Sequence, residues 1–125
     1  MLSRDAFEKA AQRLAICRDS LIVVYDDKGI YSSARAWWLF KTFGFNNIAV
    51  LDGGLPEWIQ KGFQTKERTK ETYKFGNFKA KLDNNFVIKY HEIKENITNR
   101  TFTIIDARSE GRFSGTEKEP RKQLK

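Results

Sequence analysis

Apolar residues gather in one ordered block, residues 21–58. A β-branched apolar run at 21–25 predicts a strand buried on both faces, helical spacing at 34–43 predicts a helix, and a second apolar run at 48–51 predicts another buried strand. A strand, a crossover helix and a parallel strand form one right-handed βαβ unit. The block therefore predicts an α/β fold with parallel strands and flanking helices.

The loop that leaves the first predicted strand contains Asp26, Asp27, Lys28 and Gly29. In a βαβ unit this loop points at the start of the helix, where free backbone N–H groups and the positive end of the helix dipole can hold an anion. The two carboxylates suit a solvated turn. They suit a magnesium site less well, because no third carboxylate is evident.

Weaker patterns surround this block. Residues 4–15 place apolar residues at helical spacing after Ser3, a suitable N-cap, and Pro56 fits the first turn of a short helix at 55–61. Residues 63–75 are polar and charged without a period, which is typical of a linker. These patterns predict two more helices, the second of them followed by a linker.

The second half of the chain shows only short patterns. Residues 78–82 alternate as an exposed strand would, and 87–90 predict a short extended piece. Two isoleucines four residues apart predict a helix at 91–97. An apolar run at 102–105 predicts a third buried strand, after which no further apolar element follows.

The length and the net charge of the chain limit its possible functions. The chain has 125 residues, about one domain's worth, and a net charge of +7 from 23 basic and 16 acidic residues. Most lysines are dispersed among acidic residues, so a basic nucleic-acid binder is only a third hypothesis, and we expect no nucleic-acid partner. No apolar run has membrane-spanning length and no signal-peptide pattern is present, so we expect no membrane partner.

The single cysteine, Cys17, cannot form an internal disulfide, which indicates a reducing, cytoplasmic type of compartment. One cysteine and one histidine are too few for a structural zinc site. We therefore expect no metal and no cofactor. Cys17 follows a predicted helix and is interpreted as a small, partly buried apolar residue.

Few strands are predicted for so many aromatic side chains. One βαβ unit and one separate strand leave little surface for Trp37, Trp38 and Trp58, and parallel sheets need several strands with both faces covered. We therefore expect a piece of a larger fold, with both ends missing. Such a piece should expose apolar surface and self-associate through its incomplete sheet.

Two ordered stretches resemble a known family. Residues 23–29, 33–44 and 50–59 are similar to the later part of the N-terminal domain of two-domain rhodanese-type sulfurtransferases, which use thiosulfate or 3-mercaptopyruvate. Residues 104–121 resemble the opening of their C-terminal, catalytic domain. The resemblance covers nearly the whole chain and implies a partial rhodanese-like α/β fold that is incomplete at both ends.

The resemblance also implies a division of the chain. Residues 1–63 correspond to the later part of the N-terminal, non-catalytic domain, 64–85 to an inter-domain linker, and 86–125 to the start of the catalytic domain. The catalytic cysteine of the family would lie downstream of Lys125. Hence we expect no catalytic residue in this chain.

Site residues follow from the same resemblance. Asp26 stands where a catalytic domain has its cysteine, so 26–29 form a pseudo-active loop whose carboxylate repels a second anion. Arg112 lies where the family binds the donor, and Arg121 where mercaptopyruvate-type members place a second arginine. Guanidinium groups suit a carboxylate beside a carbonyl, which favours 3-mercaptopyruvate. Lys118 replaces a usual proline.

The implied function is sulfur transfer. A sulfane sulfur would move from 3-mercaptopyruvate or thiosulfate, through a cysteine persulfide, to a thiophilic acceptor, and this chain by itself would be inactive. The alternative is a non-catalytic rhodanese-like interaction module, which Asp26 and an incomplete sheet would also suit. A cysteine-containing loop between a strand and a helix, downstream of Lys125, would favour the enzyme.

Overall fold

A computed structural model describes residues 2–67 and 74–118. The chain divides into two compact units, Met1–Ile88 and Lys89–Lys125.

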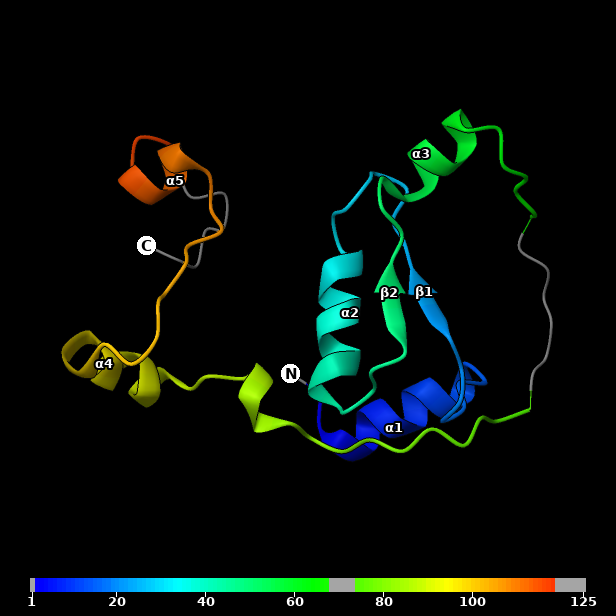
Figure 1. Cartoon of the computed structure of the whole chain (residues 1–125), viewed down its shortest axis with the longest axis horizontal. Helices are drawn as coiled ribbons and strands as arrows, with labels where there is room; N and C mark the ends of the chain where they lie inside the picture. Colours follow the sequence, from blue (N-terminus) through cyan, green and yellow to red (C-terminus); the bar gives the residue numbers. More distant parts are fainter. Residues whose placement is uncertain (1, 68–73, 119–125) are drawn as a thin grey trace. The chain divides into compact units, whose positions relative to one another are not determined.

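The first unit is built on the expected βαβ arrangement. Strand β1 (Ile22–Val24), helix α2 (Ser33–Thr42) and strand β2 (Ile48–Val50) follow one another, and the two strands pair in parallel with Ile22 opposite Ile48 (Figure 1). The α/β prediction with parallel strands and flanking helices is thereby confirmed.

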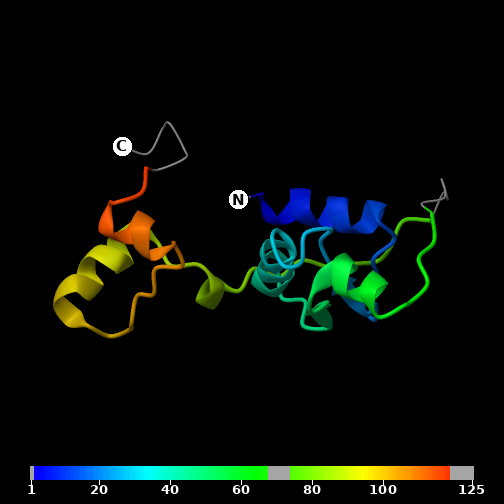
Figure 2. The same ribbon diagram turned by 90° about the horizontal axis from the view of Figure 1, so that it is seen from above.

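The core of this unit is a cluster of phenylalanines on one face of the sheet. Helix α1 (Arg4–Arg13) begins at Ser3, whose Oγ accepts the Ala6 N–H at 3.3 Å. Helix α1 runs across the C-terminal end of α2, which Figure 2 shows almost end-on, and the Phe7 ring stacks on Phe43 with centroids 4.4 Å apart. The predicted N-terminal helix is therefore confirmed, two residues shorter than expected.

Only one face of the sheet is covered by α1 and α2. Ile22 and Val24 pack against the core, whereas Leu21, Val23 and Tyr25 are more than half exposed. The expectation that this strand is buried on both faces was wrong. Its cause is that both helices pack on the same side, and within the first unit the described residues border the other side only at its carboxyl end, through α3 (Gly54–Gln60) and residues 64–66.

Helix α3 (Gly54–Gln60) follows β2 after the Gly53–Gly54 turn and begins one residue before the predicted start. Trp58 in α3 donates its indole N–H to the carbonyl oxygen of Gln64 at 3.0 Å, and its ring lies against Phe63. This contact folds the chain back over α3 as the helix ends.

Residues 74–83 run as a strap across the core rather than as an exposed strand, so that prediction at 78–82 was wrong. Phe78 is completely buried, and its N–H donates to the carbonyl oxygen of Ile16 at 3.1 Å. Lys81 donates its backbone N–H to the carbonyl oxygen of Phe43 at 3.0 Å. The strap hydrogen-bonds to a turn and a helix end, which cannot form a regular ladder.

The strap leads into a single 3₁₀ turn, η1 (Asn84–Phe86). Trp38 of α2 donates its indole N–H to the carbonyl oxygen of Phe86 at 3.0 Å. The backbone at Val87 and Lys89 is extended, as predicted for this short piece, and the next helix begins at Tyr90.

The second unit contains helix α4 (Tyr90–Asn99) and helix α5 (Glu110–Ser114). The predicted helix at 91–97 is confirmed and is longer. Asn96 of α4 is buried, and its side chain donates to the Phe102 carbonyl oxygen at 2.8 Å and accepts the Phe102 N–H at 3.0 Å. This residue fixes the chain as it leaves α4.

The predicted buried strand at 102–105 was wrong. This segment has no regular secondary structure, and Ile104 and Ile105 are exposed. A strand needs a neighbour that completes its ladder, and none of the described residues of this unit forms one. None of the helices that the structure describes is long and apolar enough to cross a membrane.

Candidate functional site

The end of β1 and the start of α2 meet at Asp26. Its side chain is buried and accepts the backbone N–H groups of Tyr31, Ser32 and Ser33, at 2.9, 2.9 and 2.7 Å. The Ser32 hydroxyl donates to the other carboxylate oxygen in a short hydrogen bond. The expected anion cradle therefore exists, and its occupant is a carboxylate from the same chain.

These contacts stabilise the charged form of the carboxyl group. The hydrogen bond from Ser32, followed by those from Ser33 and from the Tyr31 backbone, holds the pKa of Asp26 far below its usual range, against a smaller effect of burial. Asp26 is therefore ionised at neutral pH, at the N-terminus of α2, where the helix dipole also favours negative charge. A second anion meets an occupied and negatively charged site.

The rest of the predicted pseudo-active loop forms a tight turn around this cradle. Gly29 has φ +88° and bridges to Asp26, while Asp27 and Lys28 are exposed. The Lys28 ammonium lies 6.0 Å from the centre of the Tyr31 ring. Asp27 and Lys28 thus face solvent, and Asp26 alone of this set enters the cradle.

A glycine turn from the next crossover supports the loop. Leu55 donates its backbone N–H to the Asp26 carbonyl oxygen at 2.8 Å. Gly54 has φ +60°, and a Cβ there would lie 2.6 Å from the same oxygen and closer still to the carbonyl oxygen of Gly29. Only a glycine allows this approach, so the Gly53–Gly54 turn and the loop at Asp26 fix each other.

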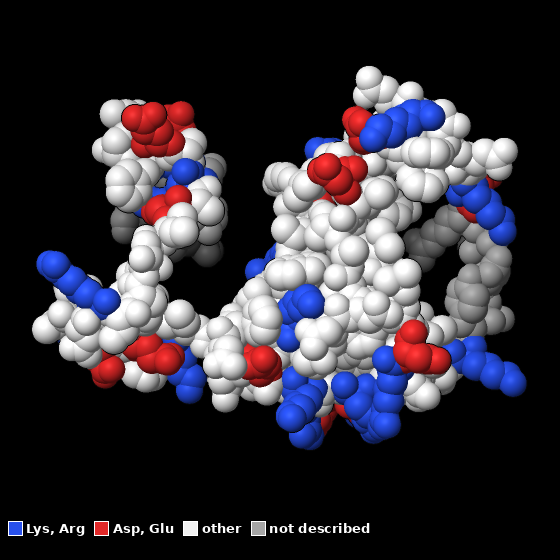
Figure 3. Space-filling view, in the orientation of Figure 1, with Lys and Arg blue, Asp and Glu red and all other residues white. Residues whose placement is uncertain are grey.

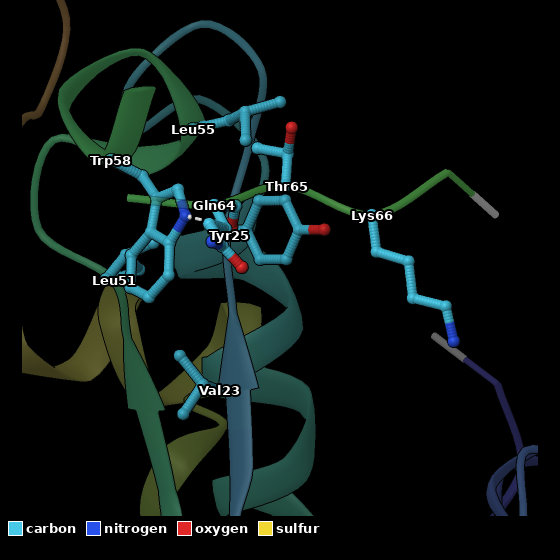
Figure 4. A pocket seen from close by; sticks show the side chains of 8 residues that line it. All are labelled: Val23, Tyr25, Leu51, Leu55, Trp58, Gln64, Thr65 and Lys66. Atoms are coloured by element: carbon cyan, nitrogen blue, oxygen red, sulfur yellow. Dashed lines mark hydrogen bonds between the residues drawn. The ribbon is translucent and has the colours of Figure 1, made fainter. Parts of the chain in front are cut away.

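A pocket of about 500 Å³ opens beside this loop, on the uncovered side of the sheet. Val23 and Tyr25 of the β1 segment, and Trp58 of α3, extend into the same space (Figure 4). The remaining lining residues are Leu51, Leu55, Gln64, Thr65 and Lys66. The pocket is mainly apolar, with one lysine at its edge, and periodicity alone did not reveal it.

In the second unit, Asp106 and Arg108 pair with each other. The Arg108 guanidinium donates to both carboxylate oxygens, at 2.7–3.0 Å, and its backbone N–H donates at 2.9 Å. Arg108, and to a smaller extent Arg112, lower the pKa of Asp106 against the effect of burial. The interpretation of Asp106 and Arg108 as a structural brace agrees with this geometry, although no strand is present.

Arg112 lies in α5, is half-buried, and places positive charge near Asp106. Arg121, the second predicted donor-binding arginine, lies outside the described residues. The predicted pair of donor-binding residues therefore stays a prediction.

Cys17 lies in the turn between α1 and β1, at the opposite end of the strand from Asp26. It is partly buried, and its backbone N–H donates to Ser20 Oγ at 2.9 Å. Among the described residues no group of three or more histidine, cysteine or acidic side chains is placed to hold a metal ion. Sequence reasoning did not single out Ser32 and Ser33, although paired serines before an apolar helix are a typical helix-start signal.

Comparisons with known proteins give a consistent result. Residues 2–61 match the rhodanese-like domain family. Over 119 residues the chain is 39% identical to human 3-mercaptopyruvate sulfurtransferase, covering 94% of this chain and 40% of that protein. It is 34% identical to the mitochondrial thiosulfate/3-mercaptopyruvate sulfurtransferase 1 of Arabidopsis thaliana, covering 98% of this chain and 38% of that protein.

Comparison with solved structures gives the same family of relatives. The Escherichia coli 3-mercaptopyruvate sulfurtransferase SseA superposes with a TM-score of 0.79 at 31% identity, over 93% of this chain and 44% of that one. The Tum1 protein of Saccharomyces cerevisiae gives a TM-score of 0.80 at 25% identity, over 97% and 42%. The chain spans about 40% of the length of the relatives it matches.

Proposed function

The chain belongs to the rhodanese family, through a rhodanese-like domain at residues 2–61, and on that premise we propose that it is part of a sulfurtransferase acting on 3-mercaptopyruvate or thiosulfate. The observation that carries the proposal is the similarity to enzymes of that activity over almost the whole of this chain. The activity is proposed for a protein that includes further polypeptide, because the matched relatives are more than twice as long.

The proposed chemistry uses a cysteine thiolate outside this chain. The thiolate attacks the sulfur of the donor and forms a persulfide. The carbon–sulfur bond of 3-mercaptopyruvate breaks, and pyruvate leaves after its enolate takes up a proton; from thiosulfate, sulfite leaves. A thiophilic acceptor then attacks the outer sulfur and regenerates the thiolate, so no net oxidation is needed.

In this proposal the second unit supplies donor binding. Arg112, and with it Arg121, would hold the carboxylate and carbonyl of the donor through paired N–H bonds. The position of Arg112 near the Asp106–Arg108 pair supports this role, because that pair fixes the chain just before α5. An Arg112→Lys variant of the sulfur-transferring protein should raise KM for 3-mercaptopyruvate more than it lowers kcat, and an unchanged KM would remove Arg112 from the donor site.

We propose residues 1–63 as the later part of a non-catalytic rhodanese domain, 64–85 as the inter-domain linker and 86–125 as the start of a catalytic domain. The compact units divide at Ile88. Phe78, inside the proposed linker, is anchored in the first unit, so the linker would be packed rather than free over part of its length. We also propose a cytoplasmic location, which rests on the single cysteine.

A second candidate function is a non-catalytic rhodanese-like interaction module. The geometry at Asp26 favours it for the first unit, because a carboxylate already satisfies the cradle, at the position that the resemblance assigns to the nucleophile. The first unit by itself would then bind a partner rather than a sulfur donor.

The test is sulfur transfer from 3-mercaptopyruvate and from thiosulfate to cyanide by this chain, with Cys17→Ser in parallel. We expect no turnover from either protein. Turnover that is lost in Cys17→Ser would identify Cys17 as the sulfur carrier and would overturn the assignment of Asp26 to the nucleophile position.

A further inference from the structure

Helix α5 is held by a side chain that follows it in sequence. Glu117 accepts a hydrogen bond from the Ser109 hydroxyl at 2.9 Å, and its backbone N–H donates to the carbonyl oxygen of Gly111, also at 2.9 Å. The chain turns back to make these contacts at Gly115, which has φ +78°. Glu117 therefore joins the residue before α5 to the first turn of α5, and Arg112 directly follows that turn's Gly111.

The side chain of Glu117 also lies against the Cα of Gly111. A Cβ at Gly111 would come within 2.6 Å of Cγ and Cδ of Glu117 and 2.7 Å of its Oε1. These distances are far shorter than van der Waals contact, so glycine leaves the room in which the Glu117 side chain lies. The contacts of Glu117 with Ser109 and Gly111 are called the α5 clasp below.

A helix as short as α5 needs such contacts. Five residues are too few for a helix that is stable by itself, because the first turn is costly to form. The clasp lies entirely within residues 109–117, so it does not depend on polypeptide outside this chain. On the other side, the Asp106–Arg108 pair fixes the segment before α5. The backbone at Arg112 is therefore held from both directions.

We propose that Glu117 is a positioning residue for donor binding, which fixes the backbone of Arg112 so that its guanidinium meets the donor in one orientation. The inference rests on the proposed role of Arg112. The paired N–H groups of a guanidinium fit a planar carboxylate and its neighbouring carbonyl only in a narrow range of orientations. The charge of thiosulfate lies on a tetrahedral group, so its binding depends more on charge than on orientation. The clasp should therefore favour 3-mercaptopyruvate over thiosulfate.

The charge of Glu117 and its contacts predict opposite effects. Both donors are anions, so a carboxylate near them weakens their binding, and charge alone predicts tighter binding when Glu117 is removed. Loss of the clasp predicts weaker binding. Figure 3 shows acidic side chains over α5 and the turn after it, with basic side chains beside them. Glu110 is exposed in the first turn of α5 and carries the same charge, so it serves as the matched control.

Steady-state kinetics of the whole sulfur-transferring polypeptide with each donor test the proposal. We expect Glu117→Ala to raise KM for 3-mercaptopyruvate at least about threefold, with kcat nearly unchanged, and to raise KM for thiosulfate less. Glu117→Gln keeps an acceptor for the Ser109 hydroxyl, so it should restore the native KM. Glu110→Ala removes a charge outside the clasp and should leave the ratio of the two KM values unchanged.

A variant at Gly111 separates positioning from stability. Gly111→Ala should strengthen the helix, since alanine is the better helix former, but its Cβ displaces the Glu117 side chain. We expect it to raise KM for 3-mercaptopyruvate as Glu117→Ala does, and the double variant should show no further increase.

Three results would overturn the inference while leaving the proposed function intact. They are an unchanged KM ratio in Gly111→Ala, an equal change of both KM values in Glu117→Ala, and a lower KM for both donors in that variant. A native polypeptide that transfers sulfur from neither donor would instead overturn the proposed function, and the inference with it.

Discussion

The carboxylate of Asp26 accepts the backbone N–H of Ser33 at 2.7 Å, so the first turn of α2 is bound by an anion from the loop that follows β1. Two further backbone N–H groups and the Ser32 hydroxyl complete the contact. Helix N-termini commonly bind anions from solution or from a substrate. Here the anion is covalently part of the crossover, which closes the site and fixes the loop.

Replacing Asp26 by Asn should destabilise the first unit. The amide group retains one acceptor oxygen but directs two donors at a cluster of donors, and the negative charge at the helix start is lost. We expect the Tm to fall by at least about 5 °C in differential scanning calorimetry. Asp27→Asn is the control, since Asp27 is exposed, and an equal effect of both changes would contradict the role of the cradle.

The same contacts predict loss of stability in acid. The pKa values of Asp26 and Glu8 are lowered in the folded chain, Glu8 mainly by the backbone N–H of Ala80 and then by Lys79. Their contributions are present above the ordinary carboxyl pKa of about 4 and are lost as the pH falls towards the lowered values, because the unfolded chain then binds more protons. Tm measured against pH should fall less steeply in Asp26→Asn than in the native chain. Parallel curves would exclude Asp26 as a source of the acid sensitivity.

A cysteine at position 26 should become a reactive thiolate. In an Asp26→Cys, Cys17→Ser variant the sulfur would take the place of the carboxylate beside the same N–H donors, which lowers a thiol pKa below its ordinary value of about 8.5. The rate of alkylation by iodoacetamide against pH reports this pKa. Asp27→Cys in the same background should titrate normally. Identical profiles would contradict the assignment of position 26 to the nucleophile site of the family.

The strap across the core should carry much of the stability of the first unit. Phe78 is completely buried among Phe7, Phe40 and Phe45, and Phe78→Ala should lower the free energy of unfolding by about 3–5 kcal/mol. Phe75→Ala, a few residues away and 75% exposed, should change it by less than about 0.5 kcal/mol. Urea unfolding curves of the two variants compare them directly. Similar losses would mean that the strap does not pack as described.

Replacing Gly54 and Gly62 by alanine distinguishes backbone strain from a steric collision. Both have positive φ, +60° and +75°, so alanine is strained at either position. Only at Gly54 does a Cβ also collide with the carbonyl oxygens of Asp26 and Gly29, whereas nothing lies within 4 Å at Gly62. Gly54→Ala should therefore lower the Tm clearly more than Gly62→Ala. Equal shifts would show that the loop at Asp26 does not depend on this close approach.

Local sequence patterns were sufficient to predict an element when that element is stabilised mainly by its own residues or by its neighbours in sequence. Helices α1 and α2 follow from apolar spacing, α1 also from the serine before its first turn, and β1 and β2 pair across one crossover. The position of Asp26 at the cradle also follows from chain order, because the loop after a strand must face the start of the crossover helix. The sequence therefore predicted the βαβ unit, the anion cradle and the resemblance to the rhodanese family.

Tertiary structure decided what depends on distant neighbours. Residues 102–105 have the composition of a strand but no adjacent strand among the described residues of their unit, so their backbone stays irregular. Phe78 belongs to a polar-looking stretch and is buried because α1, α2 and the strap meet around it. Val23 and Tyr25 have the composition of a buried strand and are exposed because both helices cover the opposite face. Burial is a property of what packs against a residue, and a pattern along one chain cannot specify that partner.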